Sequence, residues 1–306
     1  MHPAYSIIVF TSVSGLGYGL AAVLGLGLLD PAAMPVKLAH VLALGLIGAG
    51  LLSSTLHLRN PQRAWRAFSQ WRSSWLSREG VAAVATFLPL CLLAYAAIFQ
   101  SRHLPLTGAL GAAGAVVTVF CTAMIYASLK SVQAWHTPWT PACYLLLSAA
   151  GGTALGSLFA LAAGQEAAPL LAAALVFLAA AWGAKIVWRR RLKALKPLST
   201  PESATGLGFI GKVRLFERPH MNDNYLTSEM GFRVARKHAD KLFVIAVLLG
   251  GVLPGLIVLA LLAFSAAGGM AAAAMLAALA SHAAGVLVER WLFFAEARHA
   301  VMNYYE

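Results

Sequence analysis

Apolar residues run through this chain in long continuous stretches, and polar residues gather in the segments between them. A helix that crosses the hydrocarbon core of a bilayer needs about 20 predominantly apolar residues. The stretches do not alternate with a period of two, so they indicate helices and not the strands of a membrane barrel. Eight are long enough, and we expect helices over residues 5–29, 36–58, 80–99, 106–129, 142–164, 167–188, 242–264 and 267–288.

This pattern predicts an all-α integral membrane protein with about eight transmembrane helices, arranged as two four-helix bundles in a single domain over residues 1–306. Small residues recur four positions apart, as at Gly15/Gly19 and Gly152/Gly156, and this spacing favours close helix contacts in lipid. Composition agrees, because 60% of the residues are hydrophobic and only 11% are charged. A soluble domain carries charge at roughly a quarter of its positions.

Lysine and arginine lie almost entirely on one side of the predicted membrane. Eight spans put both termini on the same side, here called the N-side, and its loops and tail hold all but three of the 23 Lys and Arg residues. The exceptions are Lys37 and Arg102 on the opposite side and Lys185 within the sixth span. The positive-inside rule therefore predicts cytoplasmic termini, with residues 189–241 as a long cytoplasmic loop. With no polar domain to bind nucleic acid, the net charge of +12 indicates docking to a membrane surface or a protein.

All eight tryptophans map to the same side as the positive charge. A belt of interfacial aromatic residues normally uses both faces of a membrane, so anchoring alone does not account for the asymmetry. We therefore expect the N-side to carry a protein surface or a ligand pocket. The tryptophans are Trp65, Trp71, Trp75, Trp135, Trp139, Trp182, Trp188 and Trp291.

The densest group of chemically capable residues lies between the second and third spans, at residues 54–80. His57 closes the second predicted helix and Glu79 opens the third, so both are expected at one membrane depth. A histidine donates a hydrogen bond to a carbonyl or phenolate oxygen, and a carboxylate exchanges a proton. The pair therefore predicts a quinone site, with neighbouring side chains that dock a partner, stabilise negative charge or cover the ring: Arg63, Arg66, Trp71, Arg72, Trp75 and Arg78.

Three other interpretations stay open. Glu79 and His57 are also the residue types that complement the N-terminus and the C-terminus of a helix. A haem b cytochrome needs two axial histidines at one depth; His40 and His57 are about 25 Å apart along one helix, which leaves His57 with His282. A stand-alone transporter needs polar or broken-helix signals near mid-membrane, and Pro254 is the one clear breaker there.

The three cysteines, Cys91, Cys121 and Cys143, are widely separated within or beside apolar runs. No Cys-x-x-Cys spacing occurs, so the sequence predicts no iron–sulfur cluster and no metal site in this chain.

Three segments carry a resemblance to a known family: residues 2–6, residues 54–58, and Arg63 through Trp71 and Trp75 to Glu79. They resemble the membrane anchor subunit family of dimethyl sulfoxide reductase. The resemblance implies an anchor in the bacterial inner membrane that binds menaquinone or ubiquinone and holds no haem or cluster itself. It implies a molybdopterin catalytic subunit and a four-cluster iron–sulfur subunit as partners. It also implies a quinol-binding role for His57 and Glu79, which occupy the family's positions in this sequence.

Two features depart from the compact reductase anchors. The loop over residues 189–241 is longer, and the charge distribution predicts a cytoplasmic working face. Both are similar to the cytoplasmic sulfite-oxidising branch of the family, in which electrons run from sulfite to quinone. Residues 229–241 and the tail over residues 296–299 add to that likeness, while the terminal substrate is set by a separate subunit.

Overall fold

The computed structural model describes residues 3–55, 60–214, 216–217, 222 and 237–304. Within these residues the regular elements are helices, and none is a strand. Eight segments are long and apolar enough to cross a membrane, which confirms the predicted all-α class and number of spans. They are α1 (Tyr5–Gly25), α2 (Met34–Thr55), α3 (Trp75–Gln100), α4 (Pro105–Ala127), α5 (Trp139–Ala162), α6 (Ala168–Ala194), the segment Ala239–Ala263 and α11 (Gly268–Ala295).

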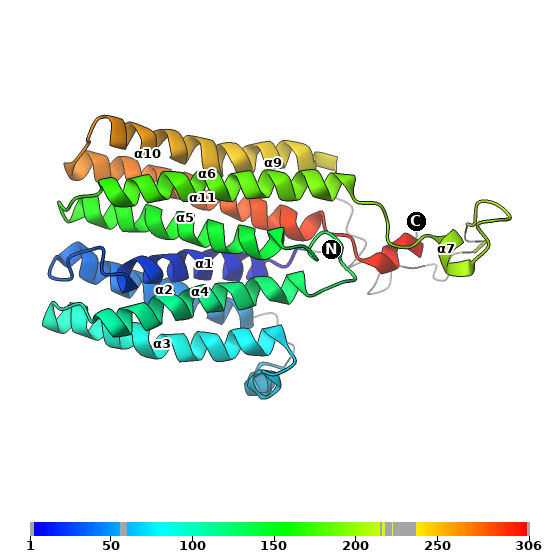
Figure 1. Cartoon of the computed structure of the whole chain (residues 1–306), viewed down its shortest axis with the longest axis horizontal. Coiled ribbons are helices and arrows are strands. Elements are labelled where there is room, and N and C mark those ends of the chain that lie inside the picture. The colour runs from blue at the N-terminus through cyan, green and yellow to red at the C-terminus, as the bar shows by residue number, and fades with distance from the viewer. Residues whose placement is uncertain (1–2, 56–59, 215, 218–221, 223–236, 305–306) are drawn as a thin grey trace.

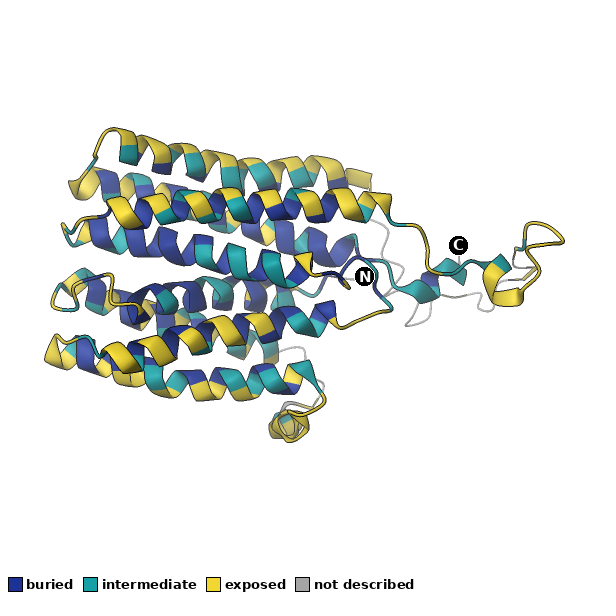
Figure 2. Ribbon diagram, viewed as in Figure 1, coloured by how far each residue is buried: buried dark blue, intermediate teal, exposed yellow. Residues whose placement is uncertain are grey.

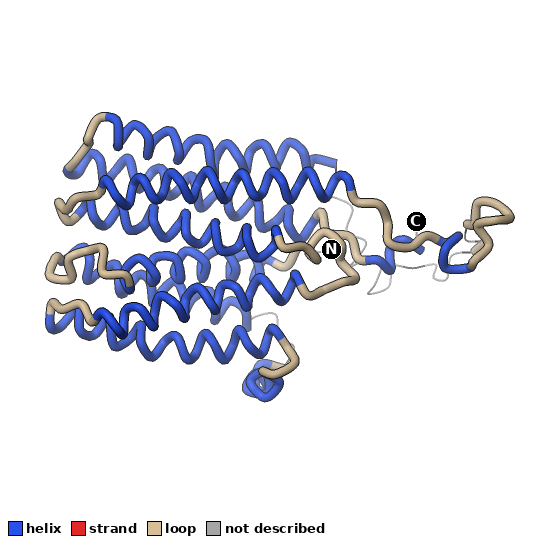
Figure 3. Tube along the Cα trace, viewed as in Figure 1, coloured by secondary structure: helices blue, strands red, loops and turns tan. Residues whose placement is uncertain are grey.

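The helices run side by side along the long axis of the molecule, and loops close the bundle at its two ends (Figures 1 and 3). Both marked termini lie at the same end of the bundle, the N-side. The short elements η1 (Pro61–Gln70), α7 (Pro201–Thr205) and η4 (Ala300–Tyr304) lie there too.

Helices α1 and α5 form the centre of the protein. α1 packs against α2, α4, α5 and α11, and α5 packs against α1, α4, α6 and α11. Buried positions accordingly concentrate on these two helices, whereas the outer span over Ala239–Ala263 is largely exposed (Figure 2).

Small residues let α1 and α5 approach until their backbones touch. A Cβ added to Gly19 would collide with the Ser148 carbonyl, and one added to Gly152 would collide with the Gly19 backbone. The Ser148 hydroxyl donates a 2.7 Å hydrogen bond to the Gly15 carbonyl across the same contact. A Cβ on Gly156 would meet the Val23 side chain, whereas one on Gly15 would have open space. The predicted small-residue contact is therefore centred on Gly19 and Gly152.

The seventh span contains a π-helical turn that α11 stabilises. It consists of α9 (Ala239–Val247), the π turn η3 (Leu248–Val252) and α10 (Leu253–Ala263). Pro254 has no N–H to offer the Gly250 carbonyl four residues earlier. His282 of α11 supplies the missing donor through Nδ1, at 2.6 Å, and the Ser281 hydroxyl donates to the Leu249 carbonyl at the same distance. The helix breaker noted in the sequence is thus satisfied by a neighbouring helix.

We expect Gly152→Leu to lower the thermal stability of the detergent-solubilised protein, by about 1–3 kcal/mol or more, because the added side chain has no space between α1 and α5. The matched control is Gly48→Leu in α2, where a Cβ meets nothing within 4 Å. Thermal unfolding followed by circular dichroism measures both variants. Equal losses in the two variants would contradict the assigned contact.

Candidate functional site

The element η1 lies across the N-side end of α3, where it appears end-on in Figure 1. The Ser77 hydroxyl donates to the Ala67 carbonyl, and the Phe68 ring lies against Gly80, 3.2 Å from where a Cβ would stand. Arg78 donates to the carbonyls of Trp71 and Arg72, at 3.0 and 2.7 Å. These contacts fix the Arg- and Trp-rich segment to the start of α3.

Most of the predicted arginines and tryptophans of this segment face away from the bundle. The side chains of Trp65 and Trp71 are 66% and 52% exposed. Arg66 lies over Trp65 and Arg72 over Trp71, with guanidinium-to-ring distances of 5.6 and 5.4 Å. We call this group the Arg/Trp surface; it consists of Arg63, Trp65, Arg66, Trp71 and Arg72, which lie on the outside of the loop.

Arg78 and Trp75 form the base of this surface. The Arg78 guanidinium lies 4.3 Å from the centre of the Trp75 ring, which meets the edge of Phe120 of α4 at 5.9 Å. Both side chains are only partly exposed, so they join the loop to the membrane-spanning helices.

Glu79 points in the opposite direction, into the protein. α3 begins at Trp75, five residues before the predicted start, so Glu79 lies in the second turn and does not cap the helix. Its carboxyl group is buried and accepts a 2.9 Å hydrogen bond from the Thr122 hydroxyl of α4. It forms no ion pair with any described residue. The interpretation of Glu79 as a complement to the helix N-terminus is therefore wrong.

The second predicted site residue, His57, lies outside the described residues. α2 ends at Thr55, immediately before that segment, and the structure is described again from Asn60. The haem alternative paired His57 with His282, and of these two histidines His282 lies among the described residues. Its Nδ1 is hydrogen-bonded to the Gly250 carbonyl. Its Nε2 faces Gly151 of α5, 3.7 Å from where a Cβ on that glycine would stand.

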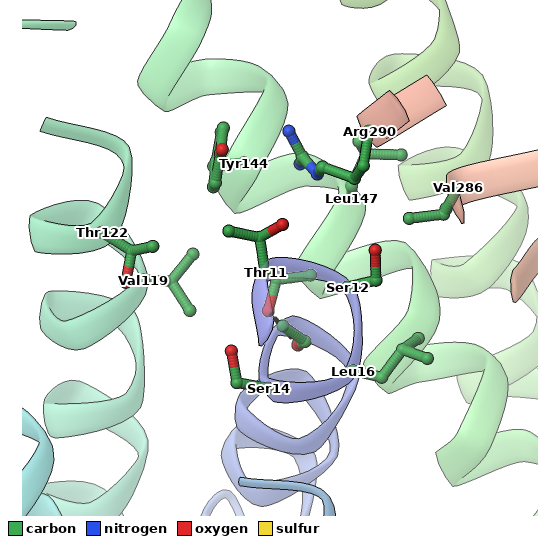
Figure 4. Close-up of a pocket in the computed structure, with 12 residues that line it drawn as sticks. Thr11, Ser12, Ser14, Leu16, Val119, Thr122, Tyr144, Leu147, Val286 and Arg290 are labelled. Atoms are coloured by element: carbon green, nitrogen blue, oxygen red, sulfur yellow. Dashed lines mark hydrogen bonds between the residues drawn. The ribbon is translucent and has the colours of Figure 1, made fainter. Parts of the chain in front are cut away.

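Thr122 connects Glu79 to a small polar cavity between α1, α4, α5 and α11. The cavity has a volume of about 20 Å³, enough for the centre of one water molecule. Figure 4 shows Arg290 reaching from α11 towards the Tyr144 ring, with Thr11 and Ser12 of α1 nearby. The polar lining consists of Thr11, Ser12, Ser14, Thr122, Tyr144, Ser148 and Arg290.

Behind the cavity lies a charged cluster, of which the sequence pattern placed only Lys185 within a span. Glu289 forms an ion pair with Lys185 of α6, with Nζ and Oε1 2.5 Å apart, and Arg290 lies 3.5 Å from the other oxygen of the same carboxylate. All three side chains are nearly inaccessible to solvent. The Arg290 guanidinium stacks 3.7 Å from the centre of the Tyr144 ring.

The predicted eighth span ended at residue 288, which put Arg290 in the N-side tail. In the structure α11 continues to Ala295, so Glu289 and Arg290 lie inside the helical bundle. The signal that points to them is the presence of ionisable residues inside otherwise apolar helices, as for Lys185. In the described part of the protein, no three His, Cys, Asp or Glu side chains lie close enough together to hold a metal ion.

Comparison with known proteins gives the family. Residues 1–295 match the family model of the DMSO reductase anchor subunit (DmsC). The sequence is 31% identical to the C subunit of the sulfite dehydrogenase of Allochromatium vinosum, over 100% of this protein and 99% of that one. It is 30% identical to the C polypeptide of the anaerobic dimethyl sulfoxide reductase of Escherichia coli, over 40% of this protein and 43% of that one. No solved structure matches. The protein therefore belongs to the DMSO reductase anchor subunit family.

Proposed function

We propose that this protein is the quinone-binding anchor of a molybdopterin oxidoreductase complex. In this role it passes electrons between a four-cluster iron–sulfur subunit and the membrane quinone pool. The observation that carries the proposal is the buried Glu79 carboxyl group beneath the Arg/Trp surface, with Thr122 as its one hydrogen-bond donor among the described residues. Membership in the anchor subunit family supports it.

The position of Glu79 suits exchange of protons with a quinone headgroup. It lies about 6 Å along α3 from the first residue of the helix, close to the level where the polar headgroups of the lipid meet the hydrocarbon. A quinone supplies two-electron chemistry and takes up or releases two protons with it. Glu79 gives or takes one of these protons, His57 donates a hydrogen bond to a quinone oxygen, and Trp75 with Phe120 provides an aromatic wall.

The Arg/Trp surface suits the docking of the iron–sulfur subunit. Arginine and tryptophan are enriched where protein interfaces derive most of their binding energy. Here they lie on η1 and the two residues that follow it, beside the end of α3 that holds Glu79. A partner bound on this surface therefore lies close to the quinone site, and Arg78 keeps the surface in register with α3.

The likeness to the sulfite dehydrogenase relative over the whole length of both proteins supports sulfite as the electron donor of the complex, with quinone as the acceptor. We further propose that the N-side faces the bacterial cytoplasm, because the Lys and Arg residues gather on it.

We expect Glu79→Gln to lower quinone-coupled turnover of the purified complex by at least about a hundredfold, because the amide cannot exchange a proton. His57→Phe should have a similar effect. Turnover with an artificial redox dye, which bypasses the anchor, should stay normal in both variants. The control is Glu166→Gln, in the turn between α5 and α6 at the opposite side of the membrane. Normal quinone turnover in both Glu79→Gln and His57→Phe would refute the assigned site.

Replacing Arg63, Arg66 and Arg72 together by alanine should detach the partner subunits while the anchor still inserts in the membrane. The physical reason is that all three are exposed and lie on one loop over the site. Copurification of the iron–sulfur subunit with the tagged anchor measures the effect. A variant with Lys37 and Arg102 replaced, on the other side of the membrane, serves as control. Full recovery of the partner with the triple variant would place the docking surface elsewhere.

A further inference from the structure

The cavity beside Thr122 contains polar atoms that the protein leaves without partners. The Tyr144 hydroxyl, the Ser12 hydroxyl and Nη1 of Arg290 are fully buried, and none has a hydrogen-bond partner among the described residues. All three residues line the cavity. Buried polar groups of this kind are normally satisfied by ordered water, and the volume accommodates it. The Thr122 hydroxyl lines the same cavity and contacts Glu79, so water there is one hydrogen bond from the quinone site.

The charged cluster extends the series of polar contacts from the cavity to Lys185 of α6, away from Glu79. Arg290 lines the cavity and contacts Glu289, which in turn contacts Lys185. A buried ion pair contributes little net stability, because removing both charges from water costs as much as their attraction returns. Ionisable residues inside membrane-spanning helices usually serve ion or proton pathways. The cluster is thus poorly explained by stability alone.

A second ion pair lies between this cluster and the N-side. Arg189, one helical turn beyond Lys185 on α6, contacts Glu296 at 2.9 Å. Glu296 follows Glu289 by two turns, about 10 Å along the axis of α11. It also lines a pocket of about 270 Å³ with Ser131, Gln133 and Asn303, formed by N-side segments. Burial raises the pKa of the Glu296 carboxyl above its ordinary value, while Arg189 and Lys185 oppose that rise.

Towards the opposite side the surroundings of the cavity become apolar. A groove that shares Val119 and Ser148 with the cavity is lined there chiefly by hydrocarbon side chains, among them Ala22, Val23 and Leu26. No Lys, Arg, Asp or Glu among the described residues lines this groove. The charged side chains that continue from the cavity therefore lead to the N-side.

We propose that the cavity, Tyr144 with Arg290, and the Lys185–Glu289 pair form a water-bridged path that carries protons between Glu79 and the N-side. This inference rests on the proposed quinone site. For each quinone reduced, two electrons are supplied by the iron–sulfur subunit and two protons by N-side water. One proton passes from the Glu79 carboxyl to a quinone oxygen, where an O–H bond forms, and the path returns a proton to Glu79. The other quinone oxygen takes the second proton directly from N-side water, so both O–H bonds of the quinol are formed. Quinol oxidation runs the same transfers in reverse.

Within this path the residues have separate roles. Arg290 keeps its proton and orients water in the cavity, since a guanidinium does not deprotonate in proteins. Glu289 is the acid of the cluster that takes and gives the proton, and Lys185 holds its carboxylate in place. Tyr144 and Thr122 relay through their hydroxyl groups. None of these side chains touches the quinone, so they act on the rate of proton delivery and not on quinone binding.

The test uses the whole complex with a short-chain quinone and compares Glu289→Gln with the double variant Lys185→Met/Glu289→Gln. We expect kcat to fall about tenfold or more in both, with KM for quinone and dye turnover unchanged. The solvent deuterium isotope effect on kcat should increase, a change that a purely structural role would not cause. Both variants remove the carboxylate beside Arg290, but the single variant also leaves Lys185 unpaired, so the double variant disturbs assembly less. Glu166→Gln is again the control.

Tyr144→Phe keeps the ring against Arg290 and removes only the hydroxyl, so it tests the path even if charge variants do not assemble. We expect kcat for quinone to fall at least about threefold in this variant, again with KM unchanged. Normal kcat and an unchanged isotope effect in Tyr144→Phe, or in an assembled double variant, would overturn the path. If Glu79→Gln alone abolishes turnover in that case, the quinone site stands and only the path is lost.

Discussion

Hydrocarbon offers no hydrogen-bond partners, so each polar group below the membrane surface must find its partner within the protein. In the helix middles, hydroxyl side chains meet this demand by donating to the carbonyl one turn earlier, as Thr118 and Ser157 do. The π turn of the seventh span meets it through another helix, because Pro254 leaves the Gly250 carbonyl without its usual donor and His282 replaces it. Polar groups of the backbone and of the side chains thus both find hydrogen-bond partners inside the protein. A buried polar group without such a partner therefore calls for a separate explanation.

The buried polar groups around the cavity and Glu79 lie at one level of the bundle. Glu79, Tyr144 and Arg290 are each within about two helical turns of the N-side ends of their helices. Around them the protein places ring systems, with Tyr126 meeting Trp135 edge-on at 5.3 Å. The aromatic layer lowers the local dielectric response, and charges beneath it therefore interact more strongly than at the surface. The tryptophan asymmetry of the sequence has a physical counterpart here, since the centre of the Trp188 ring lies 3.5 Å from the buried Lys185 ammonium group.

α3 joins the two halves of the proposed function. At its first turns, Arg78 faces outward to hold the Arg/Trp surface, and the adjacent Glu79 faces inward to α4. Consecutive residues on a helix point about 100° apart, so a single turn presents one side chain to the proposed docking surface and the next to the proposed proton-exchanging site. This arrangement explains why electron entry and quinone chemistry are expected at the same end of the bundle. It also explains why the working residues occupy a short stretch of sequence.

The sequence alone determined the all-α class, the number of spans and the crowding of charge and tryptophan on one side, because long apolar runs and a one-sided charge distribution are direct consequences of a lipid environment. It also singled out Glu79 but placed it at a helix terminus, because hydropathy averaged over a window does not locate the first turn of α3. Tertiary structure alone decided that Glu79 pairs with Thr122, and that Glu289 pairs with the distant Lys185 of another helix. In the sequence, Glu289 and Arg290 look like the polar end of a span; only the neighbouring helix, which supplies the opposite charge, makes their burial possible.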